Sequence, residues 1–177
     1  MGMKSSPDPD ARAAFLSAMT LTACTVTIVT TDGAAGRFGA TVSAMSSVSA
    51  DGDRPTLLVC MNEKVSASPA IIENGCFCVN VLRDDQAAVS DGFARRLSLD
   101  NDDKFSCAAW SEGRHGQPII KGALVNFECR VLTRQQVGTH YIFVGEVLHV
   151  QSTGGGSPLI YSNRAYATPR HLAEVTA

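Results

Sequence analysis

Five hydroxyl side chains are concentrated in the uncharged stretch GATVSAMSSVS, residues 39–49. They belong to Thr41, Ser43, Ser46, Ser47 and Ser49. Hydroxyls and backbone N–H groups can bind a phosphate group or the polyol chain of a cofactor without a charged side chain. The same residue types are also common at the edge of a strand, where they contact no ligand. The stretch therefore indicates either an anion or polyol site or a plain strand edge.

A second group of hydroxyls stands in MNEKVSASPA, residues 61–70. Ser66 and Ser68 precede a short predicted helix over residues 69–74, which Ser68 would cap and Gly75 would end. The free N–H groups and the dipole at the start of a helix attract phosphate. If the two hydroxyl segments lie side by side in a barrel, they form a polar rim suited to a phosphorylated ligand. Such a rim would consist of neutral hydroxyls, with at most Arg95 adding charge.

Motifs of several common enzyme classes are missing from the sequence. Neither G-x-G-x-x-G nor G-x-x-x-x-G-K-[ST] is present, which argues against the common nucleotide-binding α/β folds. No G-x-S-x-G occurs, and none of the four histidines has a second histidine at ligand spacing. Cys76 and Cys78 share one face of a predicted strand and are interpreted as buried strand residues. We expect no metal site.

The elements that must position these residues are mostly strands. Patterns of β-branched and alternating residues predict strands over 24–31, 37–44, 56–61, 76–82, 123–133, 140–152 and 158–162. Helices are predicted over 11–19, with Asp10 as its cap, and over 69–74 and 84–97. Because the late strands follow one another through glycine-containing turns, the pattern favours an antiparallel barrel over a doubly wound parallel sheet.

Composition narrows the class of protein further. The 177 residues, 45% of them hydrophobic, suffice for one buried core, so we expect a single domain over residues 1–177 with residues 1–10 flexible. The net charge of −2 comes from scattered residues, which excludes the basic surface of a nucleic-acid partner. No run approaches the ~20 apolar residues of a membrane span. A cytoplasmic location is expected, with the six cysteines as free thiols.

Eight segments of the chain, taken in order from about Ala14 to Tyr166, resemble the short-chain flavin reductases that serve two-component flavin monooxygenases. They are GATVSAMSSVS, LLVCMNEKVSASPAI, FCVNVL, SDGFA, DKFS, GQPIIKGALVNFECRV, GTHYIFVGEVLHV and PLIYSNRAY. No single segment is specific, but their order is. The likeness is greatest to the reductases paired with 4-hydroxyphenylacetate or chlorophenol hydroxylases, which also carry GTH where other branches carry GDH.

This resemblance implies a mainly β protein, a split antiparallel (Greek-key) β-barrel of the FMN-binding flavin reductase type with a few short helices. It also implies a homodimer that binds FAD or FMN between its subunits and takes a hydride from NADH. The reduced flavin would then diffuse to a separate FADH2-dependent oxygenase that hydroxylates a phenolic or aromatic compound. The alternative is a non-catalytic flavin-binding or flavin-sensing module on the same barrel, which would not use NADH.

The resemblance also implies roles for particular residues. The flavin would be contacted by Thr41, Val42, Ser43, Ala44, Met45, Ser46 and Ser47, and at the end of the next strand by Cys60, Met61 and Asn62. Ser66, Ala67 and Ser68 would hold its phosphate at the start of the helix.

Five further residues complete the candidate site. Phe93 is either a core residue or a neighbour of the flavin, and Arg95 would reach a diphosphate. His140 in GTHYIF would position the nicotinamide of NADH without transferring a proton, because hydride transfer depends on alignment. Arg164 and Tyr166 would close over the dinucleotide, although a plain surface aromatic is an equal alternative for Tyr166.

Overall fold

The computed structural model describes residues 10–99 and 103–172. The expectation for residues 1–10 falls outside this range except for Asp10. The three α-helices in the described residues are α1 (Ala11–Thr20), α2 (Ala67–Asn74) and α3 (Ala87–Phe93). The strands are β1 (Cys24–Thr25), β2 (Thr27–Thr31), β3 (Phe38–Val42), β4 (Met45–Ser49), β5 (Thr56–Asn62), β6 (Cys76–Val81), β7 (Trp110–Glu112), β8 (Pro118–Ile120), β9 (Val125–Val137), β10 (His140–Ser152), β11 (Ile160–Ser162) and β12 (Ala165–Ala167).

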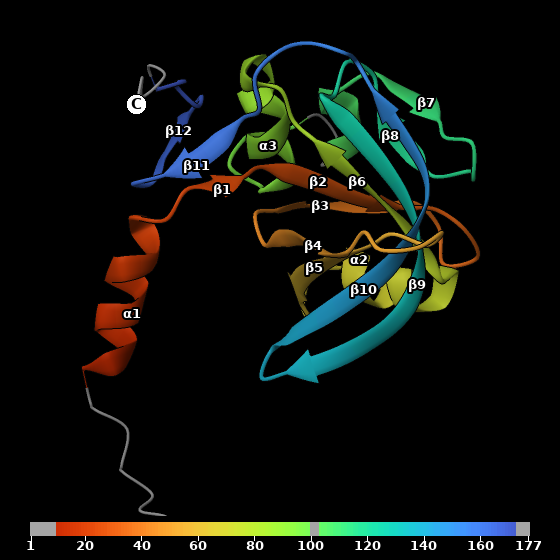
Figure 1. Ribbon diagram of the computed structural model, residues 1–177, viewed down its shortest axis with the longest axis horizontal. Coiled ribbons are helices and arrows are strands. Elements are labelled where there is room, and N and C mark those ends of the chain that lie inside the picture. Colours follow the sequence, from red (N-terminus) through yellow and green to blue (C-terminus); the bar gives the residue numbers. More distant parts are fainter. Residues whose placement is uncertain (1–9, 100–102, 173–177) are drawn as a thin grey trace, which may run out of the picture.

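Seven strands form one antiparallel sheet in the order β3-β2-β6-β9-β10-β5-β4 (Figure 1). Its two edge strands, β3 and β4, are consecutive in the chain and are separated only by Ser43 and Ala44. A link of two residues cannot cross a flat sheet, so the sheet must curl until its edges meet. The N–H of Cys60 donates to the carbonyl of Ala44 at 3.0 Å beside this link. The predicted mainly β, antiparallel barrel is confirmed.

The interior of the barrel is filled by alternating strand residues. Val29, Val59, Phe77 and Phe143 are fully buried there, and Ile71 of α2 packs into the same cluster. Burying side chains of this size contributes about 1.5–3 kcal/mol each. This core holds β3 and β5 against α2, and it thereby fixes the two predicted hydroxyl segments relative to each other.

A second core lies outside the barrel, beneath α3. It contains Val26, Leu82, Phe93, Ile120 and Leu159, all at most 2% exposed. These residues come from segments around β2, β6, α3, β8 and β11, so the core ties the C-terminal part of the chain to the first strands. The small sheet β1-β11-β12 lies beside it. Because Phe93 of α3 belongs to this core, α3 is held over β3.

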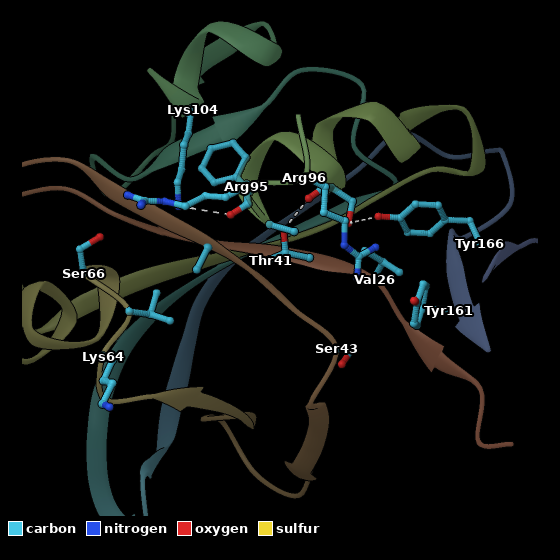
Figure 2. A pocket seen from close by; sticks show the side chains of 15 residues that line it. Val26, Thr41, Ser43, Lys64, Ser66, Arg95, Arg96, Lys104, Tyr161 and Tyr166 are labelled. Atoms are coloured by element: carbon cyan, nitrogen blue, oxygen red, sulfur yellow. Dashed lines mark hydrogen bonds between the residues drawn. The ribbon is translucent and has the colours of Figure 1, made fainter. Parts of the chain in front are cut away.

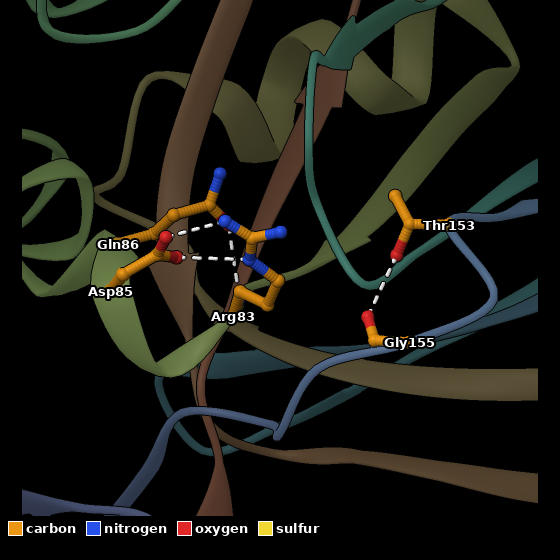
Figure 3. Close-up of polar contacts among 5 residues, drawn as sticks. All are labelled: Arg83, Asp85, Gln86, Thr153 and Gly155. Atoms are coloured by element: carbon orange, nitrogen blue, oxygen red, sulfur yellow. Dashed lines mark hydrogen bonds and ion pairs between the residues drawn. The ribbon is translucent and has the colours of Figure 1, made fainter.

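The turn before α3 is fixed by polar contacts of Arg83 (Figure 3). Its guanidinium forms an ion pair with Asp85, and its backbone N–H donates to Oε1 of Gln86 at 2.9 Å. In the loop after β10, the Thr153 hydroxyl donates to the carbonyl of Gly155 at 3.2 Å. An exposed ion pair alone contributes little, so the backbone contact to Gln86 is the more important restraint on where α3 begins.

Two predicted helix boundaries were wrong. The helix expected over 84–97 is a 3₁₀ turn over Asp84–Gln86 followed by α3, which ends at Phe93. The helix expected over 69–74 begins at Ala67, with Ser66 in the N-cap position. Ser68 is therefore not a cap: it lies in the first turn, fully buried, and its hydroxyl donates to the carbonyl of Asn62 at 2.8 Å.

Helix α1 is confirmed but buries none of its residues. Asp10 stands at its N-cap position without a capping bond from its side chain. In Figure 1 the helix projects away from the barrel. Its apolar residues Phe15, Leu16 and Met19 are 62%, 48% and 45% exposed. No helix in the described residues is long and apolar enough to cross a membrane.

Candidate functional site

A cavity of ≈ 580 Å³ lies between the end of α3, strand β3, the turn from β5 to α2 and the small C-terminal sheet (Figure 2). Its lining consists of Val26, Ala40, Thr41, Ser43, Lys64, Val65, Ser66, Ser90, Phe93, Ala94, Arg95, Arg96, Lys104, Tyr161 and Tyr166. The two hydroxyl segments singled out in the sequence thus reach one pocket, because the β3–β4 link and the start of α2 lie on the same side of the barrel.

Six of the predicted site residues line this pocket: Thr41, Ser43, Ser66, Phe93, Arg95 and Tyr166. The Thr41 hydroxyl donates to the carbonyl of Ser90 at 2.8 Å, which ties β3 to α3. Phe93 is 2% exposed in the second core, as the first interpretation expects, and it also forms part of the pocket wall. Its contact with the flavin stays a prediction.

Several other predicted residues face the interior of the protein. Strand side chains alternate, so Val42 and Met61 point into the barrel core while their neighbours Thr41 and Cys60 do not. Ala67 and Ser68 are fully buried at the start of α2. These four residues do not line the pocket.

The remaining predicted residues lie elsewhere on the single chain. Ser46 and Ser47 are exposed on β4, where the Ser46 hydroxyl donates to the carbonyl of Ser47 at 3.1 Å. His140 is exposed at the start of β10, paired with Asn62, and its Nδ1 lies 3.2 Å from the Thr139 hydroxyl. The others are Ala44, Met45, Cys60, Asn62 and Arg164, which also stand outside the pocket lining. Their roles stay predictions.

The pocket is more basic than the sequence led us to expect. Lys64, Arg95, Arg96 and Lys104 line it, and the described lining residues include no aspartate or glutamate. The sequence led us to expect at most Arg95 as a charged residue of this site, and the pocket lining contains three further cations. Lys64 and Lys104 are 40 residues apart in the chain, and only folding brings them to one cavity. The adjacent Arg95 and Arg96 were the single signal of this charge in the sequence.

Four side chains form a polar network at the other end of the pocket: Ser90, Asp91, Arg96 and Tyr166. The Tyr166 hydroxyl is hydrogen-bonded to the Ser90 hydroxyl at 2.9 Å and donates to the Asp91 carboxylate at 2.7 Å. Arg96 lies 3.4 Å from that carboxylate, and its guanidinium is 5.5 Å from the centre of the Tyr161 ring. Burial raises the pKa of Tyr166, and the Asp91 charge raises it further. This network holds two aromatic rings at the pocket wall.

The donor set suits a phosphorylated ligand that also carries a flat ring. Cationic side chains and hydroxyls bind phosphate, and aromatic side chains offer faces for stacking. Among the described residues there is no group of three or more side chains that could hold a metal ion.

Comparison with known proteins places the chain in a family. A model of the flavin reductase like domain matches residues 19–170. RutF 1 of Methylorubrum extorquens, an FMN reductase (NADH), is 40% identical over 165 residues, which are 93% of this chain and 80% of that protein. The chain belongs to the flavin reductase family. This confirms the family that the eight segments resemble.

Two solved structures show the same fold. SgcE6 of Streptomyces globisporus, an NADH:FAD oxidoreductase, superposes with a TM-score of 0.82 at 25% identity, covering 100% of this chain and 98% of that one. BorF, the flavin reductase component of a bacterial two-component tryptophan halogenase, gives a TM-score of 0.79 at 29% identity over 89% and 97% of the two chains. The chain thus shares its split-barrel architecture with an NADH:FAD oxidoreductase and with the reductase component of a two-component enzyme.

Proposed function

We propose that this protein is an NADH-dependent flavin reductase that uses FAD or FMN. The observation that carries the proposal is the pocket lining, which contains four cations and several hydroxyls and no aspartate or glutamate. Flavin nucleotides and NADH both bring phosphate groups, which such a lining binds. The names of the Methylorubrum and Streptomyces relatives support NADH as the donor and leave both flavins open as the acceptor.

The residues of the chain would bind and orient the two ligands. When bound, flavin supplies the acceptor for a hydride and NADH supplies the donor. Lys64 and Ser66, at the turn into α2, would hold a phosphate group. The hydrogen bond from Thr41 to the carbonyl of Ser90 holds β3 and α3 together where both line the pocket. Tyr161 and Tyr166 would offer ring faces for stacking.

The proposal includes a homodimer with His140 acting across the interface. On one chain His140 lies outside the pocket, at the tip of the long β9–β10 hairpin. If the hairpin of one subunit covers the pocket of the other, this imidazole would reach the nicotinamide and orient it. The exposed apolar face of α1 supports such an assembly, because a second subunit could cover it.

We further propose that reduced flavin leaves the protein in the cytoplasm and serves a separate oxygenase that hydroxylates an aromatic compound. BorF supports the first half of this statement, since it is the reductase component of a two-component enzyme. Release of the reduced flavin depends on how firmly the four cations hold its phosphate, because cationic donors bind phosphate more firmly than neutral hydroxyls do. The competing function is a flavin-binding module that never uses NADH.

One assay separates these functions. NADH consumption is followed with FAD, FMN or riboflavin as the sole acceptor, in the absence of any phenolic substrate. A reductase consumes NADH with flavin alone and hydroxylates nothing, and a separate flavin-dependent oxygenase restores hydroxylation. A chain that binds flavin but leaves NADH untouched is the binding module.

The His140→Ala variant tests the assignment of the nicotinamide pocket. It should slow flavin reduction in stopped-flow experiments and leave flavin affinity within about twofold of the wild type, because the residue lies outside the phosphate-binding part of the pocket. Ser66→Ala is the matched variant and should do the reverse. Loss of flavin affinity in His140→Ala with normal hydride transfer would show that the two roles are interchanged.

A further inference from the structure

The tip of the β9–β10 hairpin, residues 136–140, has few contacts with the rest of the chain. Strand β6 pairs with β9 only as far as Arg130, and the last bond on that side runs from the N–H of Val131 to the carbonyl of Gly75 at 2.9 Å. Beyond it, β10 is the one strand among the described residues that pairs with β9. In Figure 1 the hairpin extends past the barrel at the lower edge of the view. A segment with so few contacts is fixed only where individual bonds hold it.

Glu63, the residue that follows β5, makes two such bonds. Its N–H donates to the carbonyl of Thr139 at 2.9 Å. Its carboxylate accepts from the side-chain amide of Gln136 at 2.7 Å, and the same amide nitrogen lies 3.3 Å from the carbonyl of Gly138, to which it also donates. In the part of the chain that the structure describes, no other side-chain hydrogen bond joins the tip to the rest of the molecule. A bond to an ionised acceptor is roughly twice as strong as one between neutral groups.

The position of the His140 imidazole follows from these bonds. His140 pairs with Asn62, the residue before Glu63. Its Nδ1 lies 3.2 Å from the hydroxyl of Thr139, whose carbonyl accepts the N–H of Glu63. A shift of the tip relative to Glu63 would therefore move the imidazole. Where a reaction depends on alignment, a displacement of roughly 1 Å can cost on the order of 100-fold in rate.

We infer that Glu63 and Gln136 are positioning residues for flavin reduction, because the hydrogen bond between them fixes the hairpin tip that carries His140. The inference rests on the proposed function, in which His140 orients the nicotinamide. Neither Glu63 nor Gln136 lines the pocket, so both act through His140 and not on the ligands. Because Glu63 adjoins the pocket residue Lys64, substitutions of Gln136 give the cleaner test.

Gln136→Ala removes the side-chain bond and leaves Glu63 in place. The rate constant of flavin reduction at saturating NADH should fall about 3–10-fold in stopped-flow experiments, while the FMN dissociation constant stays within about twofold of the wild type. In the ligand-free protein, the amide of Glu63 should exchange its hydrogen faster by a similar factor, because its acceptor lies on the loosened tip. The amide of Phe143, in the buried middle of β10, should exchange at the wild-type rate.

Exchanging the two partners tests whether the bond itself is responsible. Gln136→Glu places two carboxylates side by side and should slow reduction more than Gln136→Ala does. Adding Glu63→Gln to Gln136→Glu restores an amide–carboxylate pair with the roles reversed, and should bring the rate back to within about threefold of the wild type. Gln135→Ala is the matched control, since Gln135 is the exposed neighbour on the same strand, and it should stay within about twofold.

A double-mutant cycle with His140→Ala distinguishes positioning from a general structural role. If Gln136 acts through the imidazole, Gln136→Ala should change the rate by less than about twofold in the His140→Ala background. Two independent losses that multiply would overturn the inference, and so would a Gln136→Ala protein that sediments as a monomer when the wild type is a dimer. If His140→Ala is slow and Gln136→Ala is not, this inference alone is wrong. If His140→Ala reduces flavin at the wild-type rate, the proposed role of His140 is wrong as well.

Discussion

Replacing Gly39 by alanine tests whether α3 rests directly on the strand that forms the pocket. A Cβ at this position would lie 2.6 Å from Cε1 of Phe93 and 3.3 Å from Cγ2 of Thr30. Carbon atoms pack at about 3.5–4.0 Å, so the Phe93 ring would have to move by roughly 1 Å. The substitution therefore displaces Phe93, which belongs both to the second core and to the pocket wall.

Phe93 has little room for that movement. It is 2% exposed, and its ring centre lies 5.2 Å from that of Phe105 and 5.8 Å from that of Trp110. Overpacking of a core costs about 1–3 kcal/mol. We expect Gly39→Ala to lower the free energy of unfolding by this amount, which corresponds to a fall in Tm of roughly 2–12 °C for a chain of this size.

The assay is urea unfolding followed by the fluorescence of Trp110, the single tryptophan. Protein concentration is held fixed, because assembly would otherwise shift the midpoint. Gly155→Ala is the matched control, since a Cβ there meets nothing within 4 Å, and we expect a change below about 0.5 kcal/mol.

A second substitution identifies the neighbour that causes the effect. Phe93→Leu shortens the side chain at the point of contact, so Gly39→Ala should cost less in that background than in the wild type. The coupling between the two sites should be about 0.5–3 kcal/mol. If Gly39→Ala costs less than about 0.5 kcal/mol, or if the two costs simply add, α3 does not rest on β3 as described.

Two other predictions concern the pocket wall and the assembly. Tyr166→Phe removes the hydroxyl bonded to Ser90 and Asp91 and should lower the free energy of unfolding by about 0.5–1.5 kcal/mol near pH 8. Because the pKa of Tyr166 is raised in the folded chain, its contribution is present below the ordinary tyrosine pKa of about 10 and is lost as pH rises through the raised value. Urea titrations at about pH 8 and about pH 10.5 should show that loss for the wild type and less of it for the variant. For the assembly, sedimentation at micromolar concentration should give a dimer, and the double substitution Phe15→Ser with Leu16→Ser should weaken it, because both side chains belong to the exposed apolar face of α1. A wild-type monomer with full activity would reject the shared site.

The strands were predictable from the sequence because their pattern is local. Dense β-branched residues and alternation placed β6, β9 and β10 close to their observed positions. Helix ends were not predictable in the same way. The end of α3 depends on the left-handed conformation of Arg95, which arginine rarely adopts, and the start of α2 depends on the buried bond from Ser68 to the carbonyl of Asn62. Both are tertiary effects that local propensity does not contain.

The candidate site was predictable only in part, for a related reason. Hydroxyls clustered in the sequence marked Thr41, Ser43 and Ser66, which do line the pocket. Val42 and Met61 were also predicted as site residues, but they face the barrel core, because neighbouring residues of a strand point to opposite faces of the sheet. Lys64 comes from the turn before α2 and the other three cations of the pocket from residues 95–104, so no short window of sequence shows that all four converge.

The turn that follows α3 contributes residues both to the second core and to the pocket lining. Phe93 fills the second core, Arg95 lines the pocket from a strained backbone, and Lys104 binds the carbonyl of Phe93. Changes that relax this turn act on the core and on the charge of the pocket at the same time. Strain that persists in a fold must be offset by other contacts, and at this turn those contacts include Phe93 in the second core and the Lys104 bond to the Phe93 carbonyl. The link between β3 and β4 has the opposite character: Ser43 reaches the pocket from a two-residue connection that closes the barrel, so its position follows from the fold and carries no strain of this kind.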